Sequence, residues 1–166
     1  MQGDTIASIG RGLLVLIAVG RDDEAEDAAY VVDKTVNLRV FPDAEGRFDR
    51  SALKERADLL VVSQFTLYAD TRRGRRPSFT DAAPPEQAGA IFADVVERFG
   101  GIGLRVETGV FQEMMDVSLV NDGPVTIWVD SAERHRSRRA SPRRRSCWTR
   151  QAPSPETKRP FGGHCV

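Results

Sequence analysis

The feature that most constrains this fold is a run of consecutive apolar residues from Leu13 to Val19. An apolar run of this length, without alternating polar residues, is typical of a strand that is covered on both faces. A second run begins at Leu59 and turns polar at Ser63. Strands of this kind need other elements to cover them. The sequence therefore predicts a layered domain of the α/β (α+β) class, with a mixed sheet and two main helices.

The two helices are expected between and after these runs. Asp22 and Asp23 offer a helix start, and alanines and valines follow at helical spacing as far as Val36. A second helix is expected to open at Pro84–Pro85 and to end at Gly100–Gly101. Further strands are expected at 38–41, 59–68, 104–106, 117–120 and 125–129, with a hairpin-type turn at 43–46.

Charge and composition divide the chain after Ser131. The whole chain has no formal net charge, but residues 132–166 are strongly basic, and residues 1–131 are correspondingly acidic. We expect a single domain over 1–131 and a basic, Pro- and Arg-rich, disordered tail over 132–166. No apolar run is long enough to cross a bilayer, and no secretory signal is expected.

All His and Cys residues lie in the tail: His135, Cys147, His164 and Cys165. The body therefore has no Ser-His-Asp or Cys-His triad, no thiolate nucleophile and none of the usual zinc ligand sets. Any chemistry there must use hydroxyls, carboxylates, amides, cationic side chains or the backbone. We expect no metal and no organic cofactor, and we interpret the two cysteines as free thiols.

Three stretches are candidates for a site. Ser63-Gln64-Phe65-Thr66 is the polar end of a buried strand, where hydroxyls, an amide and backbone N–H groups can surround a carbonyl; it is otherwise an ordinary strand edge. Asn121-Asp122-Gly123-Pro124-Val125-Thr126 is either a simple turn or, with a cis Gly–Pro bond, a rigid wedge. The long loop from Asp70 to Pro85 holds four arginines and an aromatic ring, which suits RNA phosphates and a base, or is merely solvated: Arg72, Arg73, Arg75, Arg76 and Phe79.

Taken together and in this order, these stretches resemble the D-aminoacyl-tRNA deacylase family. The resemblance covers about residues 2–131. It is carried by Ile9–Leu16, Val61–Leu67, Arg75–Phe79 and Asn121–Thr126. Within these stretches, Ser-Gln-Phe-Thr and Asn-x-Gly-Pro-x-Thr are the two motifs that define the family. The resemblance implies a barrel-like sheet in the fold of that family.

The resemblance also implies an activity. Family members hydrolyse the ester that joins a D-amino acid, or mischarged glycine, to tRNA; they are cytoplasmic homodimers and use no cofactor. Carried over to this chain, Ser63, Gln64, Phe65 and Thr66 hold the acyl group and the terminal adenosine. For Thr66 a positioning role is favoured over a nucleophilic one, because no side-chain base is available. Arg75, Arg76, Phe79, Asn121 and Thr126 are expected to bind the substrate or its tRNA.

The Gly123–Pro124 peptide is expected to be cis and to reach into the partner's site. Its carbonyls would there exclude the side chain of an L-residue, while glycine has no side chain to reject.

This sequence departs from the family pattern at both ends. The family has a strand with a Gln-Arg-Val element about a dozen residues before the position of Met1, and its pattern ends near Ser131. If that strand is missing, we expect an exposed sheet edge, a cavity and weakened activity. Two alternatives to a deacylase remain open: a noncatalytic RNA-binding module that uses the arginine loop and the tail, and a Ser/Thr acyl hydrolase for small molecules.

Overall fold

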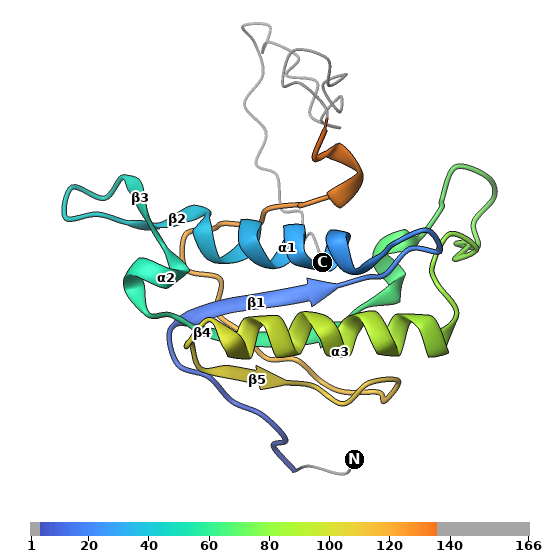
Figure 1. Cartoon of the computed structure of the whole chain (residues 1–166), viewed down its shortest axis with the longest axis horizontal. Coiled ribbons are helices and arrows are strands. Elements are labelled where there is room, and N and C mark those ends of the chain that lie inside the picture. Colours follow the sequence, from blue (N-terminus) through green and yellow to red (C-terminus); the bar gives the residue numbers. More distant parts are fainter. Residues whose placement is uncertain (1–3, 136–166) are drawn as a thin grey trace, which may run out of the picture. The chain divides into compact units, whose positions relative to one another are not determined.

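Three parallel strands form the centre of the computed structural model, which describes residues 4–135 (Figure 1). Their order is β1-β4-β5, with β1 at Gly12–Ile17, β4 at Asp58–Ser63 and β5 at Val106–Thr108. Leu13 lies opposite Leu59, and Leu59 lies opposite Val106. The two apolar runs of the sequence are therefore neighbouring strands, and their carboxyl ends meet at one edge of the sheet.

Both main helices cover the same face of this sheet. α1 (Ala25–Asn37) follows β1, and α3 (Pro85–Gly101) follows β4. Alternate residues of β4, Leu59 and Val61, share one core with residues of both helices, which shows that the helices lie on one side. The helical members of this core recur at helical spacing, as expected from the sequence: Ala28, Val32, Val36, Phe92, Val95 and Phe99. The mixed class and the two helices are confirmed.

A small antiparallel ribbon joins α1 to β4. It pairs β2 (Arg39–Pro42) with β3 (Phe48–Ser51), and a short helix, α2 (Ala52–Glu55), follows. The turn expected at 43–46 is present, because the Asp43 carboxylate accepts hydrogen bonds from the N–H groups of Glu45 and Arg47. The sequence did not predict β3 or α2, since both are short and carry no apolar period.

Several predicted boundaries were wrong. α1 has its N-cap at Glu24, whose N–H donates to the Asp27 carboxylate, so the helix starts later than Asp22–Asp23 suggested. The strand predicted at 104–106 lies at Val106–Thr108. The stretches 117–120 and 125–129 form no strand, because neither is paired with a β-strand in the described part of the chain. The barrel-like closure is not seen: β1 and β5 are open edges of the described sheet.

Two further predictions concern membranes and the tail. No helix among residues 4–135 is long and apolar enough to cross a membrane. Met1–Arg134 form one compact unit, which ends with the short turn η2 (Ser131–Glu133). The disorder predicted for 132–166, and the state of Cys147 and Cys165, fall almost wholly outside the described residues.

Candidate functional site

The Ser-Gln-Phe-Thr motif lies where β4 ends. Ser63 is the last residue of the strand, opposite Ile17 of β1, and the N–H of Gln64 still donates to the Ile17 carbonyl at 2.7 Å. The backbone then leaves the extended conformation and forms a 3₁₀ turn, η1 (Phe65–Tyr68). The strand predicted to continue to Tyr68 therefore stops at Ser63. This bend turns the motif out of the sheet at its carboxyl edge, where crevices form in α/β folds.

Two backbone donors are available at the start of this turn. The N–H groups of Phe65 and Thr66 have no hydrogen-bond partner within the described residues, as is usual for the first residues of a helical turn. Both belong to half-exposed or exposed residues. The Thr66 hydroxyl, in contrast, accepts a hydrogen bond from the Gln64 side-chain amide. The motif thus offers free N–H groups beside a hydroxyl that is already held in place.

A second layer of contacts supports η1 from the β1–α1 loop. The Asp23 carboxylate accepts a hydrogen bond from the Gly20 N–H at 2.7 Å and lies 3.5 Å from the Tyr68 hydroxyl. Burial, reinforced by the nearby Asp23 carboxylate, raises the pKa of Tyr68 to about 12. The phenol therefore stays protonated at neutral pH and does not act there as a base.

The arginine loop is joined to the motif by an aromatic contact. The rings of Phe65 and Phe79 pack edge to face, with their centroids 5.1 Å apart. Phe65 is exposed on its other side, which leaves ring surface free for a ligand. The structure thus brings together two residues that the sequence selected separately.

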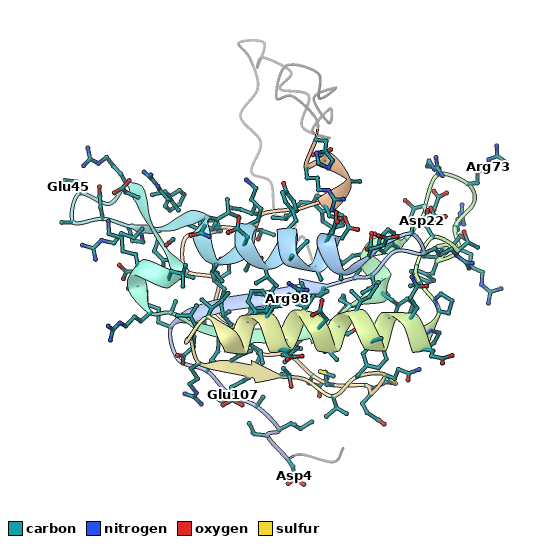
Figure 2. The ribbon with its side chains drawn as sticks, viewed as in Figure 1. Asp4, Asp22, Glu45, Arg73, Arg98 and Glu107 are labelled. Atoms are coloured by element: carbon teal, nitrogen blue, oxygen red, sulfur yellow. The ribbon has the colours of Figure 1, made fainter. Side chains whose placement is uncertain are left out.

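The arginines of this loop are not equivalent. Asp70 and Ser78 close the loop through a pair of backbone hydrogen bonds, and the guanidinium of Arg72 forms two hydrogen bonds with the Asp70 carboxylate. Arg73, Arg75 and Arg76 are exposed and make no ion pair within residues 4–135. Figure 2 shows Arg73 at the tip of the loop, pointing away from the body. Three cations are therefore available to an anionic partner, and Arg72 is already paired.

The Gly-Pro loop lies elsewhere in this chain. Asn121 and Thr126 contact each other at 3.3 Å, and the Asn121 side chain also accepts from the Val125 N–H. In Figure 1 the stretch between β5 and η2 continues beyond the end of β5, turns back along the sheet towards the side of α2, and then passes along α1 to η2. Within residues 4–135, no hydrogen bond joins Gly123 or Pro124 to the Ser-Gln-Phe-Thr motif.

The predicted cis geometry of this loop is also absent. No peptide bond in the described residues is cis, so Gly123–Pro124 is trans. The trans form of an X–Pro bond is favoured by about 0.5–1 kcal/mol unless contacts reverse the preference. Here the loop is exposed and its hydrogen bonds join residues of the loop itself, so no hydrogen bond to the rest of residues 4–135 offsets that preference.

Sequence reasoning missed the supporting residues Gly20, Arg21, Asp23 and Tyr68. Gly20 and Arg21 come shortly after a buried strand, but nothing in the sequence indicates that Tyr68 lies beside Gly20 or that Arg21 binds the Thr80 carbonyl. No cluster of three or more His, Cys, Asp or Glu residues suited to a metal ion occurs within the described ranges.

Comparisons with known proteins identify the family of this chain. The family model described as D-Tyr-tRNA(Tyr) deacylase matches residues 1–130. A D-aminoacyl-tRNA deacylase of Desulfitobacterium hafniense is 53% identical over 131 residues, covering 79% of this chain and 88% of the relative. One of Roseiflexus castenholzii is 54% identical over 132 residues, covering 80% and 84%.

Two solved structures share the fold. The c-Myc DNA unwinding element binding protein is 36% identical with a TM-score of 0.71, covering 76% of this chain and 86% of that one. A probable eukaryotic D-amino acid tRNA deacylase has a TM-score of 0.61 at 17% identity, covering 68% and 81%. The match over residues 1–130, at about half identity, shows that this chain belongs to the D-Tyr-tRNA(Tyr) deacylase family.

Proposed function

We propose that this protein hydrolyses the ester bond of D-aminoacyl-tRNA and of glycyl-tRNA mischarged on tRNA-Ala, in the cytoplasm, releasing the free amino acid and tRNA. The observation that carries the proposal is the turn at the end of β4, where the N–H groups of Phe65 and Thr66 are free in a chain of this family. The relatives that match most of the chain are themselves D-aminoacyl-tRNA deacylases.

The free N–H groups suit the chemistry of ester hydrolysis. Water adds to the ester carbonyl carbon, the carbonyl oxygen becomes an oxyanion, and the bond to the ribose oxygen then breaks as that oxygen takes a proton. Donors aimed at the oxyanion stabilise this transition state, and one such donor is typically worth about 2.7–4 kcal/mol. An aminoacyl ester is already an activated acyl group, so these donors supply much of what the reaction needs.

Thr66 is assigned a positioning role in this reaction. A threonine nucleophile needs a base to accept its proton. The hydroxyl of Thr66 is held by the Gln64 amide, and the Tyr68 phenol, with its pKa raised to about 12, stays protonated at neutral pH. We therefore infer that the neighbouring ribose hydroxyl of the substrate assists the attacking water.

We further propose that the active form is a homodimer whose site is shared between subunits. The Gly-Pro loop makes no hydrogen bond to the Ser-Gln-Phe-Thr motif within the described residues, which supports a site that is completed by the loop of a second copy. The stretch that carries this loop also exposes many apolar side chains: Met114, Val117, Leu119, Val120, Ile127 and Trp128. Exposed apolar surface of this extent is typical of an interface.

We propose that in such a dimer the loop acts as a chiral filter, although its Gly123–Pro124 bond is trans in the single chain. The carbonyls of Gly123 and Pro124 would occupy the space that an L side chain requires, whereas a D side chain points elsewhere. Gly123 has a φ of 158°, and a Cβ there would lie 2.8 Å from a side-chain atom of Val125. Replacement by alanine therefore distorts the loop.

The proposal is tested with D-Tyr-tRNA, L-Tyr-tRNA and Gly-tRNA as substrates. Release of the D-tyrosyl and glycyl esters, with the L-tyrosyl ester intact, is the expected result. Binding of all three without turnover would instead indicate a noncatalytic RNA-binding module, and cleavage of small esters alone would indicate a different acyl hydrolase.

Two variants separate the roles of the motifs. Thr66→Ala should retain turnover within about ten-fold of the wild type, because removing a positioning residue lowers the rate less than removing a covalent nucleophile. A complete loss of turnover in a folded Thr66→Ala protein would identify Thr66 as the nucleophile.

Gly123→Ala should increase hydrolysis of L-Tyr-tRNA relative to D-Tyr-tRNA, and unchanged selectivity would contradict the chiral role of the loop.

A further inference from the structure

Arg21 connects the β1–α1 loop to the arginine loop. Its Nε donates to the carbonyl oxygen of Thr80, and its N–H donates to the carbonyl of Asp81 at 3.3 Å. Its own carbonyl accepts a hydrogen bond from the Gln87 side chain in α3 at 2.9 Å. Arg21 is thus fixed by a helix of the body and in turn holds the backbone of a long loop.

This contact lies next to the aromatic pair of the candidate site. Thr80, whose carbonyl Arg21 holds, directly follows Phe79, and Phe79 packs on Phe65 of the Ser-Gln-Phe-Thr motif. The far end of the loop is anchored separately, by the bridge between Gly20 and Ala82 and by the hydrogen bond from Ala83 N–H to the Val19 carbonyl. Arg21 supplies the side-chain hydrogen bond that joins the β1–α1 loop to the segment carrying Phe79.

The segment between the bridge at Asp70–Ser78 and the anchor at Ala82 is held by Arg21 and by two contacts of its own. The Thr80 carbonyl accepts from Arg21, the Phe79 carbonyl accepts from the Ala82 N–H at 3.2 Å, and the hydroxyls of Ser78 and Thr80 lie 3.3 Å apart. The three unpaired arginines, Arg73, Arg75 and Arg76, extend from the far side of the same bridge. Fixing the base of the loop therefore fixes where these cations are presented, and preorganisation of this kind raises affinity by reducing the entropy lost on binding.

We propose that Arg21 is a positioning residue for tRNA binding: it holds the Thr80 carbonyl so that Phe79 stays on Phe65 and the free arginines face the tRNA, and it does not itself contact RNA. This proposal rests on the proposed function, because it takes tRNA to be the ligand. It assigns phosphate contact to Arg73, Arg75 and Arg76 and excludes both Arg21 and Arg72 from it.

The first test asks whether Arg21 acts through its positive charge on phosphate or through its hydrogen bond to the Thr80 carbonyl. Binding of uncharged tRNA to the full chain is measured over a range of salt concentrations for the wild type, Arg21→Ala, Arg21→Gln and Arg21→Lys, with Arg75→Ala as the matched control. Each phosphate contact that is lost lowers the slope of log K against log salt by about 0.7–0.9. Using uncharged tRNA keeps the measurement independent of whether the protein hydrolyses any ester.

A positioning role predicts a specific pattern. Arg21→Ala should weaken binding about five-fold with the salt slope unchanged, and Arg21→Gln, which keeps a neutral donor, should recover part of that loss. Arg75→Ala should weaken binding and lower the slope. If Arg21→Ala and Arg21→Gln both lower the slope while Arg21→Lys restores it, Arg21 contacts phosphate directly and the proposal is wrong.

A double-mutant cycle tests the route through the aromatic ring. If Arg21 acts by placing Phe79, then Arg21→Ala should have little further effect on tRNA affinity in a Phe79→Ala background. Fully additive effects would overturn the proposed route.

In the active enzyme, Arg21→Ala should raise KM for D-Tyr-tRNA and leave kcat within about two-fold of the wild type. A wild-type protein that binds tRNA with this pattern but releases no amino acid would refute the proposed function alone.

Discussion

At the scale of single residues, the arginine loop is stiffened by one acidic side chain. The guanidinium of Arg72 and its backbone N–H both donate to the Asp70 carboxylate, and these contacts lower the pKa of Asp70 to about 2. Because the pair is exposed to solvent, its effect on global stability is small. Its role is local: it holds one side of the loop and removes Arg72 from the cations available to RNA.

This pairing predicts a specific titration. The folded pKa of Asp70 lies below its ordinary value of 3.8, so the pair stabilises the loop above about pH 4 and is lost as the pH falls through about 2. Arg72→Ala should move the midpoint towards 3.8, although the backbone donor at position 72 keeps it somewhat lower. Carboxyl NMR measures the midpoint, with Arg73→Ala as the control. An unchanged midpoint in Arg72→Ala would show that the pair does not form.

Gly20 permits the close approach of Tyr68. A Cβ at position 20 would lie 2.6 Å from the Tyr68 hydroxyl oxygen, so Gly20→Ala should destabilise the protein by about 1–3 kcal/mol through overpacking. Gly100→Ala is the matched control, because a Cβ there meets nothing within 4 Å and alanine favours the helix. Urea unfolding measures both, and Tyr68→Phe should partly rescue Gly20→Ala. Equal stability of the two alanine variants would refute this contact.

At the scale of the elements, stability is concentrated where the helices meet the sheet. Phe99 of α3 is fully buried in the core that α1, β1 and β4 share. Phe99→Ala should therefore lower the free energy of unfolding by about 3–5 kcal/mol, because it removes a large side chain and leaves a cavity. Phe48→Ala is the control: its side chain is 58% exposed on β3, and we expect a change within about 0.5 kcal/mol. If Phe99→Ala changes the free energy of urea unfolding only slightly, Phe99 is not a central residue of the core.

The elements were predictable to the extent that their stability is local. The two uninterrupted apolar runs around Leu14 and Leu60 and the helical stripe of α3 are each visible within one segment, and all three elements were found at these positions. The stretches 117–120 and 125–129 are rich in apolar residues, as strands are, but neither has a strand to pair with within residues 4–135. A strand exists only with a hydrogen-bonding partner, which local sequence does not specify.

At the scale of the whole molecule, one chain leaves much apolar surface uncovered. Met114 and Val120 are 93% and 94% exposed, and Leu119 and Ile127 lie on the same stretch. In the proposed dimer these side chains are buried, and the Gly-Pro loop that they flank reaches the site of the other subunit.

The proposed assembly predicts the effect of a charge at this surface. Val120→Asp should shift the protein towards the monomer and reduce turnover of D-Tyr-tRNA at least ten-fold, because the carboxylate would have to be buried without a partner. Sedimentation velocity measures the assembly, with Phe48→Asp as an exposed control outside residues 114–128. A Val120→Asp protein that stays dimeric and active would exclude this stretch from the interface.

By itself, the sequence determined the family motifs, the absence of His and Cys from the body and the positions of the buried strands and both helices, because each depends on residue type and short-range spacing. Only the tertiary structure decided that Arg72 is paired while Arg73, Arg75 and Arg76 are free, and that Arg21 holds the loop beside Phe79. These facts depend on contacts between residues far apart in the chain, and no local pattern encodes which distant groups a fold brings together.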